Sequence, residues 1–230
     1  MISVVTLTYN RTNLLEEAVN SFVLQDNPNF EMIIVNDKHD LTYTIDHPNI
    51  KVINLQNRTS CILEKLMIGF KHASHEYIYR LDDDDLLAPN ALVNCANEIK
   101  NNPGYDLYRS KKHYVFVNNK FELVNDNINN GNIFCKAYYL NMSHPHRSID
   151  EDVYLYSQCK AKIFAYDFIS MIYRWGMNTF HISGYGVIPT QDLYNNLLNH
   201  FPQEEGHKTI IPNWKDDYWK LLPDIKDLKC

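Results

Sequence analysis

The chain has 230 residues, of which 45% are hydrophobic and 22% are charged, a globular composition that excludes intrinsic disorder. Its formal net charge of -6 lacks the basic excess typical of non-specific nucleic-acid binding, so we expect no nucleic-acid partner. No apolar run approaches the roughly 18 to 20 residues that cross a bilayer. The N-terminus lacks the basic start of a signal peptide. We therefore expect no transmembrane segment and no secretion leader.

The five cysteines are scattered along the chain, and no pair has the Cys-x-x-Cys spacing of a zinc site. An odd, scattered set does not predict a disulfide framework either, so a reducing compartment fits best. We expect the protein to be cytoplasmic, and a peripheral contact with a membrane remains open.

The first hundred residues alternate between strand and helix patterns. β-rich or continuously apolar runs predict strands at residues 3–8, 31–36, 51–55 and 77–81. Apolar residues at helical spacing predict helices at residues 14–23, at residues 62–70 and after Pro89. Asn13, followed by Glu16, predicts a capping box at the start of the first helix. Such repeats are typical of an α/β fold with a mostly parallel central sheet and helices on both faces.

The pattern changes after about residue 104. Residues 112–117 and 120–124 predict a β-hairpin, residues 151–160 a short helix, and residues 169–173 a strand. With no internal repeat or linker, we predict one domain over residues 1–190, with a first half at 1–100 and a smaller β/α half at 101–190. Residues 191–230 predict a helical extension that packs on this domain. Trp214 and Trp219 would make this contact, and the alternative is that they contact a partner or a membrane.

Four consecutive aspartates, Asp82 to Asp85, follow the fourth predicted strand. Adjacent carboxylates repel one another unless a positive charge lies among them, which points to a hard divalent cation. Two further polar loops, at residues 8–10 and 36–37, follow strands of the same sheet. Ligands of such sheets bind beyond the carboxyl ends of the strands. The three loops therefore predict one site, although an acidic surface turn has the same sequence pattern.

Three segments together resemble the family 2 glycosyltransferases of the GT-A fold. They are residues 4–11 (VVTLTYNR), residues 30–37 (FEMIIVND) and residues 76–85 (EYIYRLDDDD) followed by Pro89. The resemblance covers residues 2–100 well and residues 130–180 more loosely. Besides Asn36, which stands where an aspartate is more usual, two positions in this region depart from the family pattern: Thr59 replaces a glycine, and Lys65 begins the segment where an Ala-Arg-Asn motif is usual.

The resemblance implies a nucleotide-sugar donor, with a UDP-sugar as the default because Asp37 suits an imide N–H. It assigns nucleotide binding to Thr8, Tyr9, Asn10, Asp37, Arg58, Asp82 and Asp83. The run of aspartates occupies the family's Asp-x-Asp position. It implies Mn²⁺ or Mg²⁺ with Asp84 and Asp82 as ligands, and leaves Asp85 in an outer shell or as a helix cap. The family's histidine is replaced by Gly176, and His181 is a candidate to supply the lost metal ligand.

The segment around residues 148–155 (SIDEDVYL) resembles the family's Glu-Asp segment below the acceptor. By that match Asp152 is the general base that takes the proton of the acceptor hydroxyl, and Glu151 is its positioning partner. An acidic first turn favoured by the helix dipole would look the same. The family implies an inverting transfer to a glycan or a lipid-linked acceptor, and leaves fusion to further domains open.

Other classes fit less well. A sugar nucleotidylyltransferase or a dinucleotide-binding oxidoreductase would need a glycine-rich loop after the first strand, where this chain has none. An EF-hand would space its acids at alternate positions around a glycine. A non-catalytic module that binds a nucleotide sugar or a glycan within a larger assembly remains the alternative to an enzyme.

Overall fold

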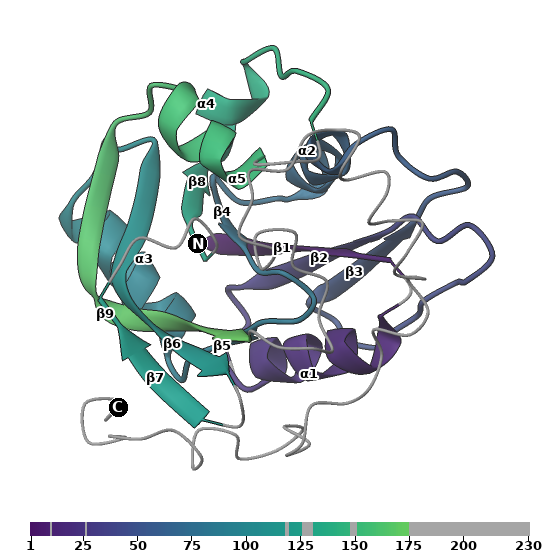
Figure 1. The fold of residues 1–230 in the computed structure, drawn as a ribbon, viewed down its shortest axis with the longest axis horizontal. Coiled ribbons are helices and arrows are strands. Elements are labelled where there is room, and N and C mark those ends of the chain that lie inside the picture. Colours follow the sequence, from purple (N-terminus) through teal and green to yellow (C-terminus); the bar gives the residue numbers. More distant parts are fainter. Residues whose placement is uncertain (10, 26, 118–119, 126–130, 148–150, 175–230) are drawn as a thin grey trace.

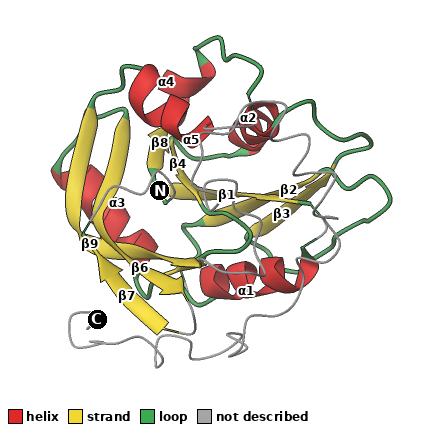
Figure 2. Cartoon of the chain, in the orientation of Figure 1, coloured by secondary structure: helices red, strands yellow, loops and turns green. Residues whose placement is uncertain are grey.

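The structure, a computed structural model, describes residues 1–9, 11–25, 27–117, 120–125, 131–147 and 151–174. These residues form a single mixed sheet with helices on both faces (Figures 1 and 2). The order of the strands is β3-β2-β1-β4-β8-β6-β9-β5, and β7 pairs with β6 outside this path. None of the described helices is both long and apolar enough to span a membrane.

The first half of the chain builds the parallel part of the sheet, as its alternating pattern predicts. Its strands are β1 (Ile2–Thr8), β2 (Glu31–Asn36), β3 (Ile50–Asn54) and β4 (Tyr77–Arg80). β1 pairs in parallel with both β2 and β4, and β2 pairs in parallel with β3. Because β1 is central and covered on both faces, even Ser3 and Thr6 are fully buried.

The second half extends the same sheet rather than forming a separate one. Its strands are β6 (Leu107–Val117), β7 (Lys120–Val124), β8 (Ile133–Cys135) and β9 (Ile163–Arg174), and β9 also pairs with the short β5 (Leu86–Leu87) of the first half. β8 is antiparallel to both β4 and β6, so it joins the two halves. β6 and β7 form the predicted hairpin, whereas β9 is much longer than the predicted strand and runs parallel to β6.

Helices cover the two faces of the sheet in two sets. α1 (Thr12–Val23) and α3 (Ala91–Asn101) pack in one core cluster. The opposite cluster receives α2 (Ile62–His72), α4 (Lys136–Leu140) and η1 (Tyr154–Gln158), a π-helical turn that continues α5 (Glu151–Val153). Gly69 lets α2 approach β1, because a Cβ at this position would overlap the Val5 side chain. The α/β fold with a mostly parallel central part is therefore confirmed.

Two local predictions are wrong. α1 begins at Thr12, and its N-cap residue Arg11 makes no side-chain cap bond, so Asn13 does not start a capping box. α3 begins at Ala91 after Asn90, so Asp85 does not cap it. In both places the geometry of the preceding turn sets the first helical residue, and a pattern of residue types does not define that geometry. The predicted extension at 191–230, with Trp214 and Trp219, lies outside the described residues.

Candidate functional site

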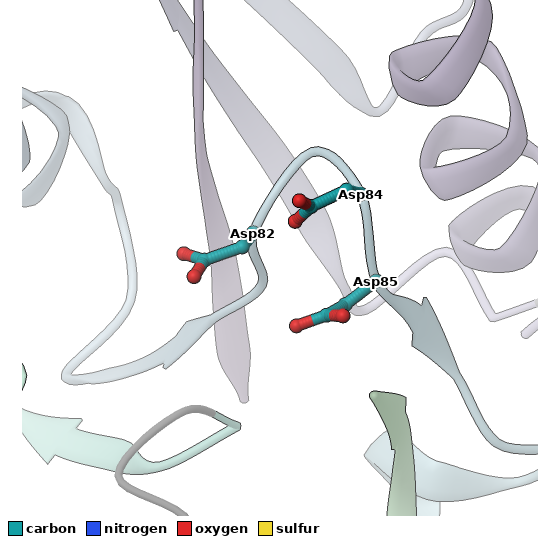
Figure 3. Close-up of side chains that lie close together, drawn as sticks. All are labelled: Asp82, Asp84 and Asp85. Carbon is teal, nitrogen blue, oxygen red and sulfur yellow. The ribbon is translucent and has the colours of Figure 1, made fainter. Parts of the chain in front are cut away.

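The carboxyl ends of β1, β2 and β4 meet at one edge of the sheet, where Thr8, Asn36 and Arg80 are the last strand residues. Each of the three polar loops singled out in the sequence begins here. β4 continues into the aspartate loop, which turns back to β5 (Figure 3). The candidate site is therefore at the position where parallel sheets bind ligands.

Three of the four aspartates converge. Carboxylate oxygens of Asp82, Asp84 and Asp85 all lie within 4.8 Å of one another, and their side chains leave a single loop (Figure 3). A backbone hydrogen bond of 3.1 Å from the Asp85 N–H to the Asp82 carbonyl closes this loop into a turn. Asp85 thus stands beside the two aspartates assigned to the metal, a role the sequence did not give it.

The aspartate loop is held by Arg174, the last residue of β9. Its backbone N–H donates to Asp85 Oδ1 at 2.9 Å, and its guanidinium donates to the Asp84 carbonyl and to Glu17 of α1. Arg174 and Glu17 are 0% and 1% exposed, so this is a buried ion pair. Burial raises the pKa of the Asp85 carboxyl well above its usual range, and the Asp84 and Asp82 charges add to that shift.

The fourth aspartate, Asp83, faces the loop after β1. Arg11 donates from Nη1 to Asp83 Oδ1 at 3.0 Å and to Asp84 Oδ2 at 2.8 Å, so one guanidinium bridges two of the carboxylates. Burial raises the pKa of Asp83 to about 6, with Arg11 opposing the shift and Asp84 adding to it. Three of the four aspartates, Asp83, Asp84 and Asp85, are thus bound by two arginines that come from distant parts of the chain.

A divalent cation fits this cluster. Hard cations take carboxylate oxygens as ligands, and three such oxygens converge here. Asp85 is fully buried, and its Oδ2 finds no hydrogen-bond partner among the described residues. A buried carboxylate oxygen without a partner is costly, and a bound cation would remove that cost. Asp82, Asp84 and Asp85 are therefore the residues that could hold it.

The nucleotide side begins at Tyr9. The Arg58 guanidinium lies over the Tyr9 ring at 4.1 Å from its centroid, and Lys38 Nζ lies 5.8 Å from the same centroid. Two cations and one aromatic ring at a strand end suit a nucleotide, because the ring can stack on the nucleobase and the cations attract the phosphates. Tyr9 and Arg58 are therefore together, as the sequence assignment requires.

Asp37 is buried and already has partners. Its Oδ2 accepts from the backbone N–H of Thr59 at 3.2 Å and from the Thr59 hydroxyl at 2.9 Å. Its Oδ1 accepts from Lys65 Nζ, which also donates to the carbonyl of Thr8. Burial lowers the pKa of Lys65, and the Asp37 carboxylate opposes this shift. The two departures from the family pattern, Thr59 and Lys65, therefore both serve to hold Asp37.

The segment of Glu151 and Asp152 is tied to β4 through Arg80. Its Nη2 donates to Glu151 Oε1 at 2.8 Å, and its Nε donates to Asp82 Oδ1 at 3.0 Å. Burial raises the pKa of Glu151, although Arg80 opposes the change. Asp152 is more exposed, and its Oδ1 accepts from the Val153 N–H at 2.8 Å. Glu151 is thus a positioned group, and Asp152 is the one left open to solvent.

Tyr173 of β9 links the two sides electrostatically. Burial raises the pKa of its hydroxyl, and the charges of Asp85, Asp84, Asp82 and Asp152 act in the same direction. The aspartate cluster and the proposed base therefore act on one phenol. Neither Tyr173 nor Arg80 was assigned a role from the sequence.

Two assigned residues, Asn10 and His181, lie outside the described residues, as does Gly176. The residues that sequence reasoning missed are Arg11, Glu17, Lys65, Arg80 and Arg174. One signal could have found Glu17 and Lys65. Each is a charged residue inside the apolar face of a predicted helix, where burial demands a partner.

The comparison with known families decides the relationship. The model of the Glycosyl transferase family 2 matches residues 3–148, which is more than half of the chain. The chain belongs to this family. A glycosyltransferase of Rickettsia typhi, described as uncharacterized, is 30% identical over 126 residues, which are 50% of this chain and 40% of that relative. The chain thus spans less than half of the length of such family members.

Solved structures agree with the family. Residues 1–349 of TarS of S. aureus, in complex with UDP-GlcNAc, superpose with a TM-score of 0.62 at 19% identity over 84% of this chain and 63% of that fragment. The mannosyltransferase PcManGT of Pyrobaculum calidifontis, in complex with GDP-Man and Mn²⁺, gives a TM-score of 0.55 at 16% identity over 74% of this chain and 56% of that one. At this identity the likeness concerns the fold, and it confirms the GT-A assignment.

Proposed function

We propose that this family 2 glycosyltransferase chain transfers a sugar, with inversion, from a nucleotide diphosphate sugar to an acceptor hydroxyl with the help of Mn²⁺ or Mg²⁺. The observation that carries the proposal is the convergence of three carboxylates at the end of β4, beside Tyr9 and Asp37. An acidic surface turn would leave its carboxylates in solvent, whereas Asp84 and Asp85 are 5% and 0% exposed.

On the donor side, Tyr9 and Arg58 offer a ring and a cation for the base and the phosphates. Asp37 keeps acceptor capacity for a base N–H, since an ionised carboxylate has about four lone-pair sites and three donors occupy it. We take a UDP-sugar as the donor because an imide N–H suits this carboxylate. TarS was solved with UDP-GlcNAc and PcManGT with GDP-Man, which supports a nucleotide sugar and leaves the base to experiment.

At the aspartate loop, Asp82, Asp84 and Asp85 would hold the cation. When bound, a divalent cation offsets the negative charge that develops on the leaving diphosphate. Arg174 and Arg11 keep the loop in shape by binding the Asp84 carbonyl and the Asp83 carboxylate. The chain therefore orients the leaving group before the bond to the sugar breaks.

On the acceptor side, Asp152 would take the proton from the attacking hydroxyl. It is partly exposed and faces no ion-pair partner among the described salt bridges, so its oxygens can reach an incoming acceptor. Glu151 is bound to Arg80, which also holds Asp82, so the base segment and the metal segment share one arginine. A glycan or a lipid-linked hydroxyl would suit this open side.

The compartment follows from the cysteines. Cys61, Cys95, Cys135 and Cys159 are free in the described part of the chain, which supports a reducing cytoplasmic environment.

The test is a thermal-shift screen of UDP- and GDP-sugars with and without Mn²⁺. A donor that binds the folded state raises the melting temperature by mass action. We expect a rise with a UDP-sugar that requires Mn²⁺ and disappears in Asp84→Asn. A rise with GDP-sugars alone would overturn the donor, and no rise with any nucleotide sugar would overturn the site. Release of free sugar in the absence of an acceptor would separate an enzyme from a binding module.

A further inference from the structure

A buried arginine on β6 has no acceptor for two of its nitrogens within the part of the chain that the structure describes. Arg109 is 2% exposed, and its Nε and Nη2 find no hydrogen-bond acceptor among the described residues. It also takes no part in any of the described salt bridges. A guanidinium removed from water without an acceptor is costly, and such groups are normally paired. The Arg109 side chain therefore has capacity for an acceptor that the described residues do not supply.

The sheet register places Arg109 beside the acceptor half of the proposed site. Ile78 of β4 pairs with Phe134 of β8, and Phe134 pairs with Leu107 of β6. All three side chains belong to the core cluster on the face covered by α2 and η1. Because side chains alternate along a strand, Arg80 and Arg109, two residues further on, point to this same face.

The two arginines are close enough to act on one ligand. β8 separates β4 from β6, and neighbouring strands lie about 4.8 Å apart, so the Arg80 and Arg109 backbones are about 10 Å apart. The Arg80 N–H donates to the Asn132 carbonyl at 3.0 Å, which continues the β4–β8 register by one residue. Arg80 also has a buried Nη1 without an acceptor among the described residues, although Glu151 and Asp82 hold its other nitrogens.

The surroundings of Arg109 are basic and aromatic. The Tyr156 ring of η1 stacks on its guanidinium, 4.4 Å from the centroid. Lys111 and Lys112 follow on the same strand, and Lys112 pairs with Asp167 at the surface. Tyr156 is half-buried, so rotation of one ring would open the guanidinium to a ligand. A π-helical turn such as η1 is frequent at functional sites.

We propose that Arg109 is an anion-binding subsite on the acceptor side, which recognises a phosphate or carboxylate group carried by the acceptor. The assignment of the bound anion to the acceptor rests on the proposed function, whereas the binding of an anion at Arg109 does not. Nε and Nη2 of Arg109 form one edge of a planar guanidinium, and such an edge binds oxyanions in a bidentate manner. Arg80 Nη1 would take a second oxygen of a phosphate, and Tyr156 would keep the guanidinium in its plane.

The test is an NMR titration that follows the signal of each arginine side chain separately. The chain contains six arginines, so the Nε–Hε correlations of arginine-¹⁵N-labelled protein form a small spectrum. Sodium phosphate, sodium acetate and sodium chloride are titrated at matched ionic strength. We expect a saturable shift of the Arg109 signal with phosphate or acetate and none with chloride. The anion that shifts it more identifies the acceptor chemistry. No shift with either oxyanion would mean that internal water satisfies Arg109, and would overturn the proposal.

Variants give an independent readout. Phosphate should raise the melting temperature of the wild type and of Lys111→Gln, an exposed basic neighbour on the same strand. The same rise should be lost in Arg109→Gln and in Arg109→Met. Equal phosphate-induced rises in all four proteins would overturn the assignment. A titration with UDP and Mn²⁺, followed at the Arg11 and Arg58 signals, tests the donor site separately, so failure of either proposal is recognised by itself.

Discussion

The buried ion pair between Glu17 and Arg174 should govern both stability and metal affinity. Both side chains are at most 1% exposed, and Arg174 also holds the Asp84 carbonyl and the Asp85 carboxylate. Glu17→Gln keeps the shape of the side chain but leaves the Arg174 charge without its carboxylate on α1. The variant therefore isolates the charge of this one partner.

The expected loss can be bounded. Removing one partner of a buried pair costs about 3–5 kcal/mol, because an uncompensated charge remains inside the protein. The Asp84 carbonyl still accepts from the Arg174 guanidinium and opposes part of that cost, so we expect the low end, about 3 kcal/mol. For a chain of this size about 1 kcal/mol lowers the melting temperature by about 2–4 °C. Glu17→Gln should therefore melt about 6–12 °C below the wild type.

Urea unfolding followed by circular dichroism measures the change in the free energy of unfolding. Glu16→Gln is the matched control, because Glu16 is exposed on the same helix, and it should stay within about 0.5 kcal/mol of the wild type. A double-mutant cycle with Arg174→Met should give a coupling energy of about 2–3 kcal/mol. A loss below about 1 kcal/mol in Glu17→Gln would refute the view that this pair fixes the aspartate loop.

Four further predictions concern the proposed site. Asp84→Asn should weaken Mn²⁺ binding about tenfold or more in isothermal titration, because it removes a charged ligand; unchanged affinity would contradict the metal assignment. Arg11→Gln should instead tighten Mn²⁺ binding, by about tenfold, because the guanidinium now neutralises Asp83 and Asp84; weaker binding would show that Arg11 assists the cation. Asp152→Asn should lower kcat about 10²–10⁴-fold and leave donor affinity unchanged, whereas full kcat would exclude it as the base. The metal-free protein should lose stability as the pH rises from about 4 to about 6. In this range the folded state holds a proton on Asp83 that the unfolded state releases at its ordinary pKa near 3.9. In Asp83→Asn the fall of the free energy of unfolding with pH should be smaller, and an equal fall would assign the pH dependence to other carboxyls.

The sequence predicts the strands and loops that form the site better than the charged partners that hold them. Strands that are buried on both faces have continuous apolar runs, so β1, β2 and β4 and the polar loops after them could be located. The aspartate run could be placed at the end of β4 for the same reason. What a local pattern cannot give is the partner of each charge, because partners such as Arg174 and Asp85 lie far apart in the chain.

The same limit explains the second half of the chain. β8 has only three residues, and β6 and β9 pair in parallel across more than fifty intervening positions. Short or non-local strands carry little periodicity, so neither the junction at β8 nor the row that joins Arg80 to Arg109 was expected. The role of Asp85 escaped for a related reason: its membership of the carboxylate cluster depends on the turn between Asp82 and Asp85.

The arrangement of arginines suggests how one loop can serve two tasks. Arg11 and Arg174 hold the aspartates from the side of α1 and β9, and Arg80 holds Asp82 together with Glu151. A cation that enters the cluster would compete with Arg11 for Asp84 and with Arg80 for Asp82, but it would leave the bond from Arg80 to Glu151 in place. Donor binding would therefore release Arg11 while the acceptor side stays in place. If Asp152 is the base, as we propose, its segment is in place before the donor arrives, because Glu151 stays bound to Arg80 with or without the cation.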